Sequence, residues 1–245
     1  MYSSRFMGNK AYLVTYKTDD PLFVIDLSNE TKPTVLGELH IPGYSTYLHP
    51  YDENHLIGIG METEEIVNKN SIGKVTSTTS KITGMKMALF DVSDVNNPTQ
   101  LSQTIIGDSR TTSAILTNPK ALLFSKEKQL LAIPVNNYSE DFEIDSSIDS
   151  YSSIVDSYTN YNKSYVSEGY FVYKININDG FNLKGVITHE TSQKNKNKSS
   201  YSYNYNNSKL LRGLYIDNNL YTISETAIKV NNLDTLELID ELKIK

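Results

Sequence analysis

The sequence of 245 residues contains no cysteine and only four histidines. The absence of cysteine excludes disulfide bonds, thiolate metal sites and cysteine nucleophiles. Because histidine is scarce, we would expect any general base to be a carboxylate, and the 29 acidic residues leave no single candidate. Composition therefore narrows the possible chemistry without pointing to a catalytic residue.

Several kinds of motif are also missing. The sequence has no glycine-rich phosphate loop, no G-x-S-x-G and no H-E-x-x-H. No apolar run approaches the ~18–20 residues of a transmembrane helix, and the start of the chain lacks a basic segment followed by a long apolar stretch. We therefore expect no transmembrane segment and no signal peptide in this chain. A net charge of −6 without a dominant basic patch argues against a nucleic-acid partner.

What the sequence does contain is a repeated hairpin. Residues 21–43, PLFVIDLSNETKPTVLGELHIPG, begin with an apolar run that is rich in β-formers and too short for a helix. Asp26 favours a turn after this run, because its side chain can accept from a backbone amide two residues on. Pro33 then ends the loop, since it holds the preceding residue in extended geometry and a strand restarts.

A second copy of this hairpin lies at residues 87–107, MALFDVSDVNNPTQLSQTIIG. In both copies the proline lies seven positions after the turn aspartate, and an isoleucine lies eight positions after the proline. A glycine closes each copy. The matching residues are Asp26, Pro33, Ile41 and Gly43 in the first copy, and Asp91, Pro98, Ile106 and Gly107 in the second.

Two further copies follow that keep fewer of the repeat residues. In the third, Lys174, Phe181 and Gly185 take the places of Asp26, Pro33 and Gly37, and a fourth hairpin with a shorter loop occupies 227–244. Helical periodicity is almost absent. Further strands are expected at 11–16, 44–49, 55–60, 130–135 (at a sheet edge or bulge, because of Pro134), 211–215 and 220–223.

The repeat predicts one all-β domain over residues 1–245. We expect a β-propeller of about four four-stranded antiparallel blades, because such sheets cannot bury both faces alone and radial stacking covers them. Three polar segments, at about 62–84, 136–168 and 191–208, interrupt the repeat and are interpreted as inserted loops. Because the repeat residues are explained by turn geometry, we expect any binding specificity to lie in these inserts.

Local clusters give weak indications of a site. Residues 49–55, HPYDENH, hold two histidines and two carboxylates, but their spacing matches no zinc pattern, so a hairpin turn is preferred over a zinc or calcium site. Residues 176–180 are similar to a calcium loop, yet the twelfth position is Ile187, which cannot ligate. We predict no catalytic residue, no cofactor-binding residue, no metal ligand and no cofactor.

Other polar features have equally simple interpretations. The lysines at 194, 196 and 198 favour a solvated loop over a phosphate site. The tyrosines of 151–205 could line a sugar- or peptide-binding surface, but a flexible loop is the preferred interpretation. Asn29, Asn162 and Asn197 fit the N-glycosylation triplet, which arises freely in a chain rich in Asn and Ser.

Several stretches carry a family resemblance. They are RFMGNKAYLVTY, DPLFVIDLS, LGELHIPGYSTYLHPYDENHLIGIG, LFDVSD and LYTISETAIKVNNLDTLE. In these the sequence is similar to a family of prokaryotic β-propeller proteins distantly related to WD40 repeats. The resemblance implies a propeller in a secreted or cell-surface setting and implies no activity. Proteins of this type are usually longer, so the chain either closes a ring of its own or resembles the C-terminal part of a larger ring.

The leading hypothesis is a non-enzymatic ligand-binding or protein-interaction scaffold outside the cytoplasm, with a protein, peptide or glycan as partner. The alternative is an enzyme, a hydrolase or oxidoreductase, with its site in the propeller channel, which convergent polar residues there would favour. A third hypothesis is a portion of a larger propeller that needs missing blades or a neighbouring domain for stability.

Overall fold

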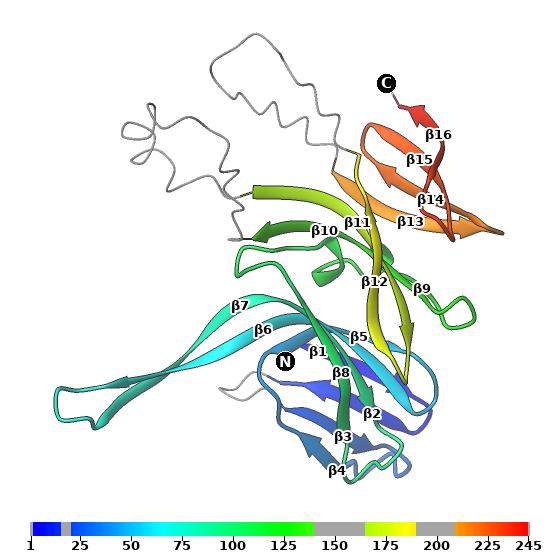
Figure 1. The fold of residues 1–245 in the computed structure, drawn as a ribbon. Helices are drawn as coiled ribbons and strands as arrows, with labels where there is room; N and C mark the ends of the chain where they lie inside the picture. Colours follow the sequence, from blue (N-terminus) through cyan, green and yellow to red (C-terminus); the bar gives the residue numbers. More distant parts are fainter. Residues whose placement is uncertain (1, 16–20, 140–164, 190–208, 245) are drawn as a thin grey trace, which may run out of the picture.

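Figure 1 shows the computed structural model, which describes residues 2–15, 21–139, 165–189 and 209–244. As predicted, the fold is all-β, with four four-stranded antiparallel sheets. The helices in these ranges are two short 3-10 turns, η1 (Ala114–Leu116) and η2 (Pro119–Ala121). No helix among the described residues has the length and apolar character needed to cross a membrane.

Each sheet is a blade made of four strands that follow one another along the chain. Blade 1 contains β1 (Ser3–Met7), β2 (Lys10–Val14), β3 (Leu22–Asp26) and β4 (Thr34–Leu39). Blade 2 contains β5 (Tyr44–Pro50), β6 (His55–Lys69), β7 (Val75–Asp91) and β8 (Thr99–Ile106). Blade 3 contains β9 (Leu123–Ser125), β10 (Leu130–Ser139), β11 (Tyr165–Asn176) and β12 (Gly180–Ile187), and blade 4 contains β13 (Leu210–Ile216), β14 (Asn219–Ser224), β15 (Ala227–Asn232) and β16 (Leu238–Lys243).

The turn chemistry of the first two copies is confirmed. Asp26 accepts a hydrogen bond from the Ser28 amide at 2.9 Å, and Asp91 accepts one from the Ser93 amide at 2.8 Å. The two closing glycines both have left-handed backbone, with φ of 75° at Gly43 and 59° at Gly107. Aspartate and glycine therefore fix the ends of the repeat as the sequence predicts.

The third and fourth copies have the same strand-pairing register as the first two. The last strand of every blade contains a β-bulge next to the same rung of the sheet. Gly185 lies opposite Val172 in blade 3 as Gly37 lies opposite Val24 in blade 1, so the predicted alignment of the third copy is correct. The residues that bulge out of the pairing are Leu36, Leu101, Lys184 and Ile239.

The blades stack face to face in an arc, with blade 1 and blade 4 at its two ends (Figure 1). Three clusters of buried side chains join blade 1 to blade 2, blade 2 to blade 3, and blade 3 to blade 4. Tyr12 and Phe90, Ile59 and Phe171, and Val172 and Leu220 are representative members of the three clusters. Among the described residues, none of these clusters joins blade 1 to blade 4, so the arc is open.

The interpretation of 62–84 as an inserted loop is wrong. β6 and β7 continue through this segment as an antiparallel ribbon, in which Glu64 pairs with Lys81. Asn70 closes the ribbon, because its side chain accepts from the amides of Ile72 and Lys74. The segment shows no apolar periodicity because a ribbon exposed on both faces needs none, while its Val, Ile and Thr residues still favour extended backbone.

The two other predicted inserts are described only in part. β10 extends to Ser139 and β11 starts at Tyr165, so both ends of the predicted 136–168 loop are strand. Residues 140–164 and the 191–208 insert lie outside the described residues. β10 is an inner strand of blade 3 and not an edge strand, but Pro134 lies beyond the residues 130–132 that pair with β9, so the proline interrupts no pairing on that side.

Candidate functional site

Several connections leave the blades at one end. The ribbon joins the second and third strands of blade 2, and residues 140–164 join the second and third strands of blade 3. In a four-stranded meander, these connections lie at the same end as the segments that lead into the next blade. We define the ribbon end by residues 40–43, 62–84, 107–113 and 136–138. Figure 1 shows the ribbon projecting from it, away from the stacked blades.

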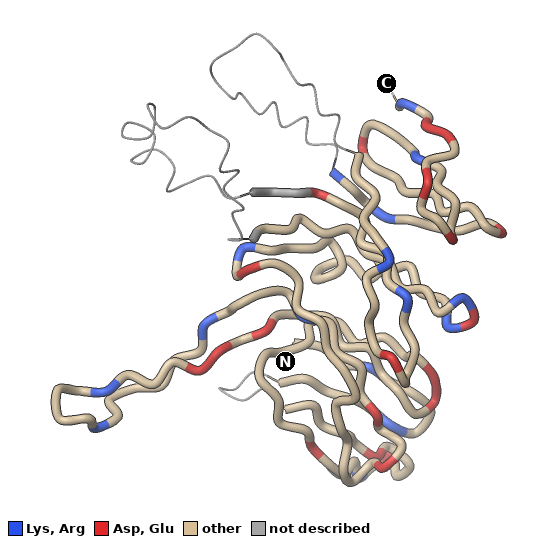
Figure 2. Tube along the Cα trace, viewed as in Figure 1, with Lys and Arg blue, Asp and Glu red and all other residues tan. Residues whose placement is uncertain are grey.

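Both long edges of the ribbon are without a neighbouring strand in the described structure. β5 pairs with β6 only as far as Met61, and β8 pairs with β7 only from Met85 onward. The acidic residues lie on β6 near its base, whereas lysines flank the tip (Figure 2). The exposed apolar side chains of the ribbon are Ile66, Val67, Ile72 and Val75.

A buried ion pair holds the base of the ribbon. Lys86 is only 2% exposed, and its Nζ lies 3.0 Å from Oε2 of Glu62. The same ammonium donates to the carbonyl of Pro42. Burial lowers the pKa of Lys86, while the neighbouring Glu62 carboxylate acts to raise it. The Gly43 amide donates to Thr63 Oγ1 at 2.8 Å, so the connection from blade 1 and the ribbon are joined directly.

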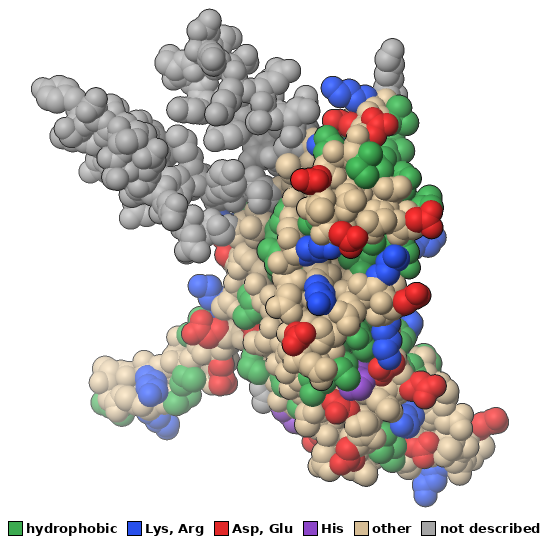
Figure 3. Space-filling view, turned by 45° about the vertical axis from the view of Figure 1, so that its right-hand side comes forward, with side chains coloured by type: hydrophobic (Ala, Val, Ile, Leu, Met, Phe, Trp, Pro, Cys, Tyr) green, Lys and Arg blue, Asp and Glu red, His purple; other side chains and the backbone are tan. Residues whose placement is uncertain are grey.

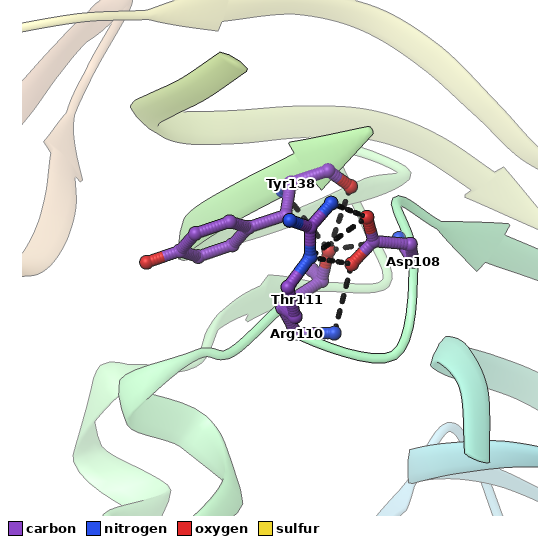
Figure 4. Close-up of polar contacts among 4 residues, drawn as sticks. All are labelled: Asp108, Arg110, Thr111 and Tyr138. Carbon is purple, nitrogen blue, oxygen red and sulfur yellow. Dashed lines mark hydrogen bonds and ion pairs between the residues drawn. The ribbon is translucent and has the colours of Figure 1, made fainter. Parts of the chain in front are cut away.

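On the other side of the base, Asp108, Arg110, Thr111 and Tyr138 form a polar network (Figure 4). The guanidinium of Arg110 donates to both carboxylate oxygens of Asp108, and its carbon lies 5.5 Å from the ring centroid of Tyr138. The Arg110 hydrogen bond holds the pKa of Asp108 below its usual value. Thr111 Oγ1 accepts from the Tyr138 amide at 3.1 Å, which ties the loop after β8 to the end of β10.

Glycines make both connections possible. A Cβ added at Gly43 would lie 2.3 Å from the Met61 carbonyl oxygen. A Cβ added at Gly107 would lie 1.9 Å from Thr111 Oγ1 and 2.5 Å from the Tyr138 carbonyl oxygen. The close packing of backbone at the ribbon end therefore requires glycine at both of these positions.

The predicted histidine cluster does not converge. The His49 ring packs edge-on against Phe124, and its Nδ1 lies 3.0 Å from the hydroxyl of Tyr47. Burial lowers the pKa of His49 to about 4. His55 instead contacts Asp52, with Nδ1 2.7 Å from Oδ1. The two histidines therefore contact different side chains and do not face a shared site.

The Asp52 carboxylate is already occupied by protein groups. Its Oδ2 accepts from Lys126 Nζ at 2.7 Å, and its Oδ1 accepts from the Asn54 amide at 2.9 Å. Burial acts to raise the pKa of Asp52, but these hydrogen bonds outweigh it and set the pKa to about 2. Among the described residues no three potential metal ligands gather, here or elsewhere. The segment forms the predicted hairpin turn between β5 and β6.

The other sequence candidates are turns or lie outside the described residues. Asn176 Oδ1 accepts from the Asn178 and Asp179 amides at 2.9 and 2.8 Å, so the predicted turn is confirmed. Asn29 Oδ1 accepts from the Thr31 amide at 3.1 Å in an exposed turn. The lysines at 194–198, and Asn162 and Asn197, fall in segments that the structure does not describe.

A cavity of about 520 Å³ lies between blades 3 and 4. Lys128, Lys174 and Lys184 line it together with Asp234, and Lys184 Nζ donates to the Leu233 carbonyl at 2.6 Å. Basic and acidic side chains are interspersed over the face shown in Figure 3. Sequence reasoning could not find this cavity, because its lining comes from five separate segments of the chain.

Sequence reasoning also missed the networks at the ribbon end. Lys86 is visible in the sequence as a single charge in the apolar run MKMALF, immediately before the second copy. Its partner Glu62 lies on the neighbouring strand, which could be inferred only once the ribbon pairing was known. The contact between Arg110 and Tyr138 joins the loop after β8 to blade 3, across 28 positions of the chain, and no local sequence pattern indicates it.

The comparison with family profiles supports the fold. The profile described as "Beta propeller domain" matches residues 1–236. An uncharacterized protein of Methanocaldococcus jannaschii is 40% identical over 145 residues, which are 59% of this chain and 20% of that protein. An uncharacterized protein of Archaeoglobus fulgidus is 27% identical over 246 residues, which are 100% of this chain and 28% of that protein.

A mutant of the Synechocystis apocarotenoid oxygenase is similar in structure, with a TM-score of 0.39 and 10% identity over 96% of this chain and 46% of that chain. The chain thus spans about a fifth to just over a quarter of the length of the curated relatives it matches. The family profile covers nearly all of the four blades. The chain belongs to the beta propeller domain family.

Proposed function

We propose that this chain is a non-enzymatic ligand-binding or protein-interaction scaffold whose binding surface is the ribbon end. The observation that carries the proposal is the β6–β7 ribbon, which extends two strands beyond the blade and leaves both of their edges without a neighbouring strand. Unpaired strand edges are sites where an extended peptide can add by backbone hydrogen bonding.

The β7 edge suits an added strand better than the β6 edge. Residues Val75–Ser80 carry no charge, whereas the β6 side of the ribbon base carries Glu62, Glu64 and Glu65. Charged side chains along an edge discourage strand addition. We therefore propose that the partner is an extended peptide segment of another protein, bound along Val75–Ser80.

The base of the ribbon supports this role. The buried Lys86–Glu62 pair and the Gly43–Thr63 hydrogen bond join the ribbon to the core of the blades. A segment anchored in this way is already ordered before the partner binds. Binding therefore costs less conformational entropy. The Arg110–Tyr138 pair adds an aromatic surface beside the same base.

We also propose that the end faces of the arc receive further blades. The curated relatives extend well beyond the matched region, which is consistent with neighbouring domains in those proteins. Apolar side chains are exposed on blades 1 and 4, among them Val35 and Leu242. A further four-stranded sheet on each face would cover them, as each internal blade covers its neighbour.

For location, we propose a secreted or cell-surface setting. The support is the resemblance of the sequence to propeller proteins of that kind. Protease treatment of intact cells that produce the full protein tests it. Digestion of the propeller before lysis is the expected result, and protection until lysis would contradict it.

A shortened ribbon tests the binding role. Glu64 and Lys81 are paired, so residues 65–80 can be replaced by an Asn-Gly turn that preserves the register. We expect the melting temperature to change by no more than about 2–4 °C, because the removed residues are exposed. The purified chain and the shortened variant are then screened against arrays of peptides and glycans.

We expect peptide ligands that bind the original chain and not the shortened variant. The variant Ile72→Ser is the matched control, because it changes the tip and leaves both edges intact, and it should retain binding. Equal binding by the shortened variant would contradict the assignment of the site. Ligands confined to the glycan array would contradict the peptide class.

A further inference from the structure

The cavity between blades 3 and 4 is positively charged, although the chain as a whole has a net charge of −6. Lys128, Lys174 and Lys184 line it, and among the described lining residues Asp234 is the one acidic side chain. The lining therefore has a net charge of +2. Its volume of about 520 Å³ lies in the range of sites that bind small molecules.

These lysines have no acidic partner. None of the three ammonium groups forms an ion pair with a carboxylate of the described residues. Lys128 Nζ lies 5.3 Å from the ring centroid of Tyr215, and Lys184 Nζ donates to a backbone carbonyl. Asp234 instead accepts a hydrogen bond from the side chain of Asn218 at 2.9 Å. An anion in the cavity would supply the negative charge that the described side chains do not.

Lys184 differs from the repeat at this cavity. It bulges out of the last strand of blade 3, and the residues that bulge at the same place in the other blades are apolar, namely Leu36, Leu101 and Ile239. Between blades 1 and 2, Leu36 and Val95 pack against the buried apolar cluster. The fold therefore accepts an apolar residue at this position, and the bulge does not need the charge of Lys184.

Lys174 also differs from the repeat. It occupies the rung that Asp26 has in blade 1 and Asp91 has in blade 2. Both aspartates accept a hydrogen bond from an amide two residues on, whereas in blade 3 Asn176 makes this turn contact. Lys174 thus has no part in the turn. The two lysines that replace repeat residues, Lys174 and Lys184, line the same cavity.

The backbone around the cavity contains further exceptions. Three non-glycine residues of the described chain have left-handed backbone, with φ of 50° at Gln129, 54° at Asp217 and 61° at Leu236. Gln129 lines the cavity, and Asp217 directly precedes the lining residue Asn218. Leu236 lies in the same turn as Asp234. Such backbone is unfavourable for a residue with a Cβ, and it is found preferentially at functional sites.

We propose that this cavity binds a small organic phosphate monoester, with the lysines around its phosphate group. A phosphate monoester carries a charge of about −1.5 to −2 at pH 7, which matches the net charge of the lining. Lysine binds phosphate as a point charge. Tyr173, Leu183 and Leu233 provide apolar surface for the organic part. A single carboxylate would leave about half of the positive charge unmatched.

The cavity is separate from the ribbon end. Gln129, Asn218 and Asp234 lie in turns that join the first strand of a blade to the second, or the third to the fourth. The ribbon joins the second strand to the third, so it leaves the blade from the other end of the strands. The proposal therefore goes beyond peptide binding at the ribbon, and either can fail without the other.

Isothermal titration calorimetry of the purified chain with phenyl phosphate tests the proposal. Inorganic phosphate lacks the apolar body, and benzoate carries a single charge on a similar body, so these two are the comparison ligands. We expect phenyl phosphate to bind at least about tenfold more tightly than either of them. Its affinity should fall as the NaCl concentration rises, because the attraction is between charges that water and salt can reach.

Two variants test the lysines. Lys184→Leu introduces the residue that blades 1 and 2 have at the bulge, so the fold should tolerate it, and Lys174→Gln removes the second charge. Each should weaken the binding of phenyl phosphate about tenfold or more, and circular dichroism verifies the fold. Lys32→Gln is the matched control. It removes one charge from an exposed turn of blade 1 and should leave binding unchanged.

Several outcomes would overturn the proposal. The absence of any phenyl phosphate binding up to about 10 mM would reject the site. Equal affinity for benzoate would reject a phosphate as the ligand group, and equal affinity for inorganic phosphate would reject the organic part. Full binding by both Lys184→Leu and Lys174→Gln would place the ligand outside this cavity. The shortened ribbon variant should bind phenyl phosphate as the original chain does, and loss of binding there would contradict the separation of the two sites.

Discussion

Replacing Gly107 by alanine tests whether backbone packing at the ribbon end determines stability. Gly107 has φ of 59°, and an added Cβ would overlap Thr111 Oγ1, Asn137 Oδ1 and the Tyr138 carbonyl. Left-handed backbone costs a residue with a Cβ about 1–2 kcal/mol. Overpacking adds about 1–3 kcal/mol. We therefore expect Gly107→Ala to lower the free energy of unfolding by about 2–5 kcal/mol.

Gly8→Ala is the matched control. Gly8 also has a positive φ of 57°, in the turn between β1 and β2, but nothing lies within 4 Å of its added Cβ. Only the backbone cost applies there, about 1–2 kcal/mol. Urea titration at one protein concentration measures both variants, with the m-value verifying that unfolding stays comparable. Equal losses in the two variants would refute the argument, because they would show that the clash at Gly107 relaxes freely.

Three further predictions follow from buried groups. Leu89→Ala, between blades 2 and 3, should cost about 2–5 kcal/mol by urea titration, while Ile72→Ala at the exposed tip should change stability by less than about 0.5 kcal/mol. Lys86→Met should cost about 3–5 kcal/mol because it leaves Glu62 buried without its partner, and the double variant with Glu62→Leu should recover most of that loss in a double-mutant cycle. Burial lowers the pKa of His189 to about 4, below the unfolded value near 6.5, so its neutral form is favoured in the folded state. Stability should fall as pH drops from about 6.5 to 4, and His189→Gln should reduce that slope in melting experiments at several pH values.

The repeated hairpin was predictable because its information is local. Asp26 and Asp91 bind amides two residues on, and Gly43 and Gly107 adopt backbone that other residues avoid. These effects act within a few residues and leave a fixed spacing in the sequence. The third copy has Lys174 in place of the aspartate, yet its strand-pairing register is the same. Gly185 pairs with Val172 as Gly37 pairs with Val24.

The ribbon was missed for a physical reason. Sequence periodicity reports which side of an element is buried, and residues 63–69 and 75–81 expose most of both faces. The contacts at the ribbon end were missed because they join distant segments, such as Arg110 with Tyr138. For residues 49–55 the sequence favoured a hairpin turn over a metal site, because the spacing of the ligand types matches no zinc pattern. In the structure His49 contacts Tyr47 and His55 contacts Asp52.

Each blade uses consecutive strands, and this has a consequence for how such a chain can be made and altered. In each of the four sheets, every strand pairs only with strands of its own blade. A sheet can therefore form as soon as its own four strands have left the ribosome. A whole blade is likewise one uninterrupted stretch of gene. Duplication or loss of that stretch changes the circumference of a ring while every remaining ladder of backbone hydrogen bonds stays intact.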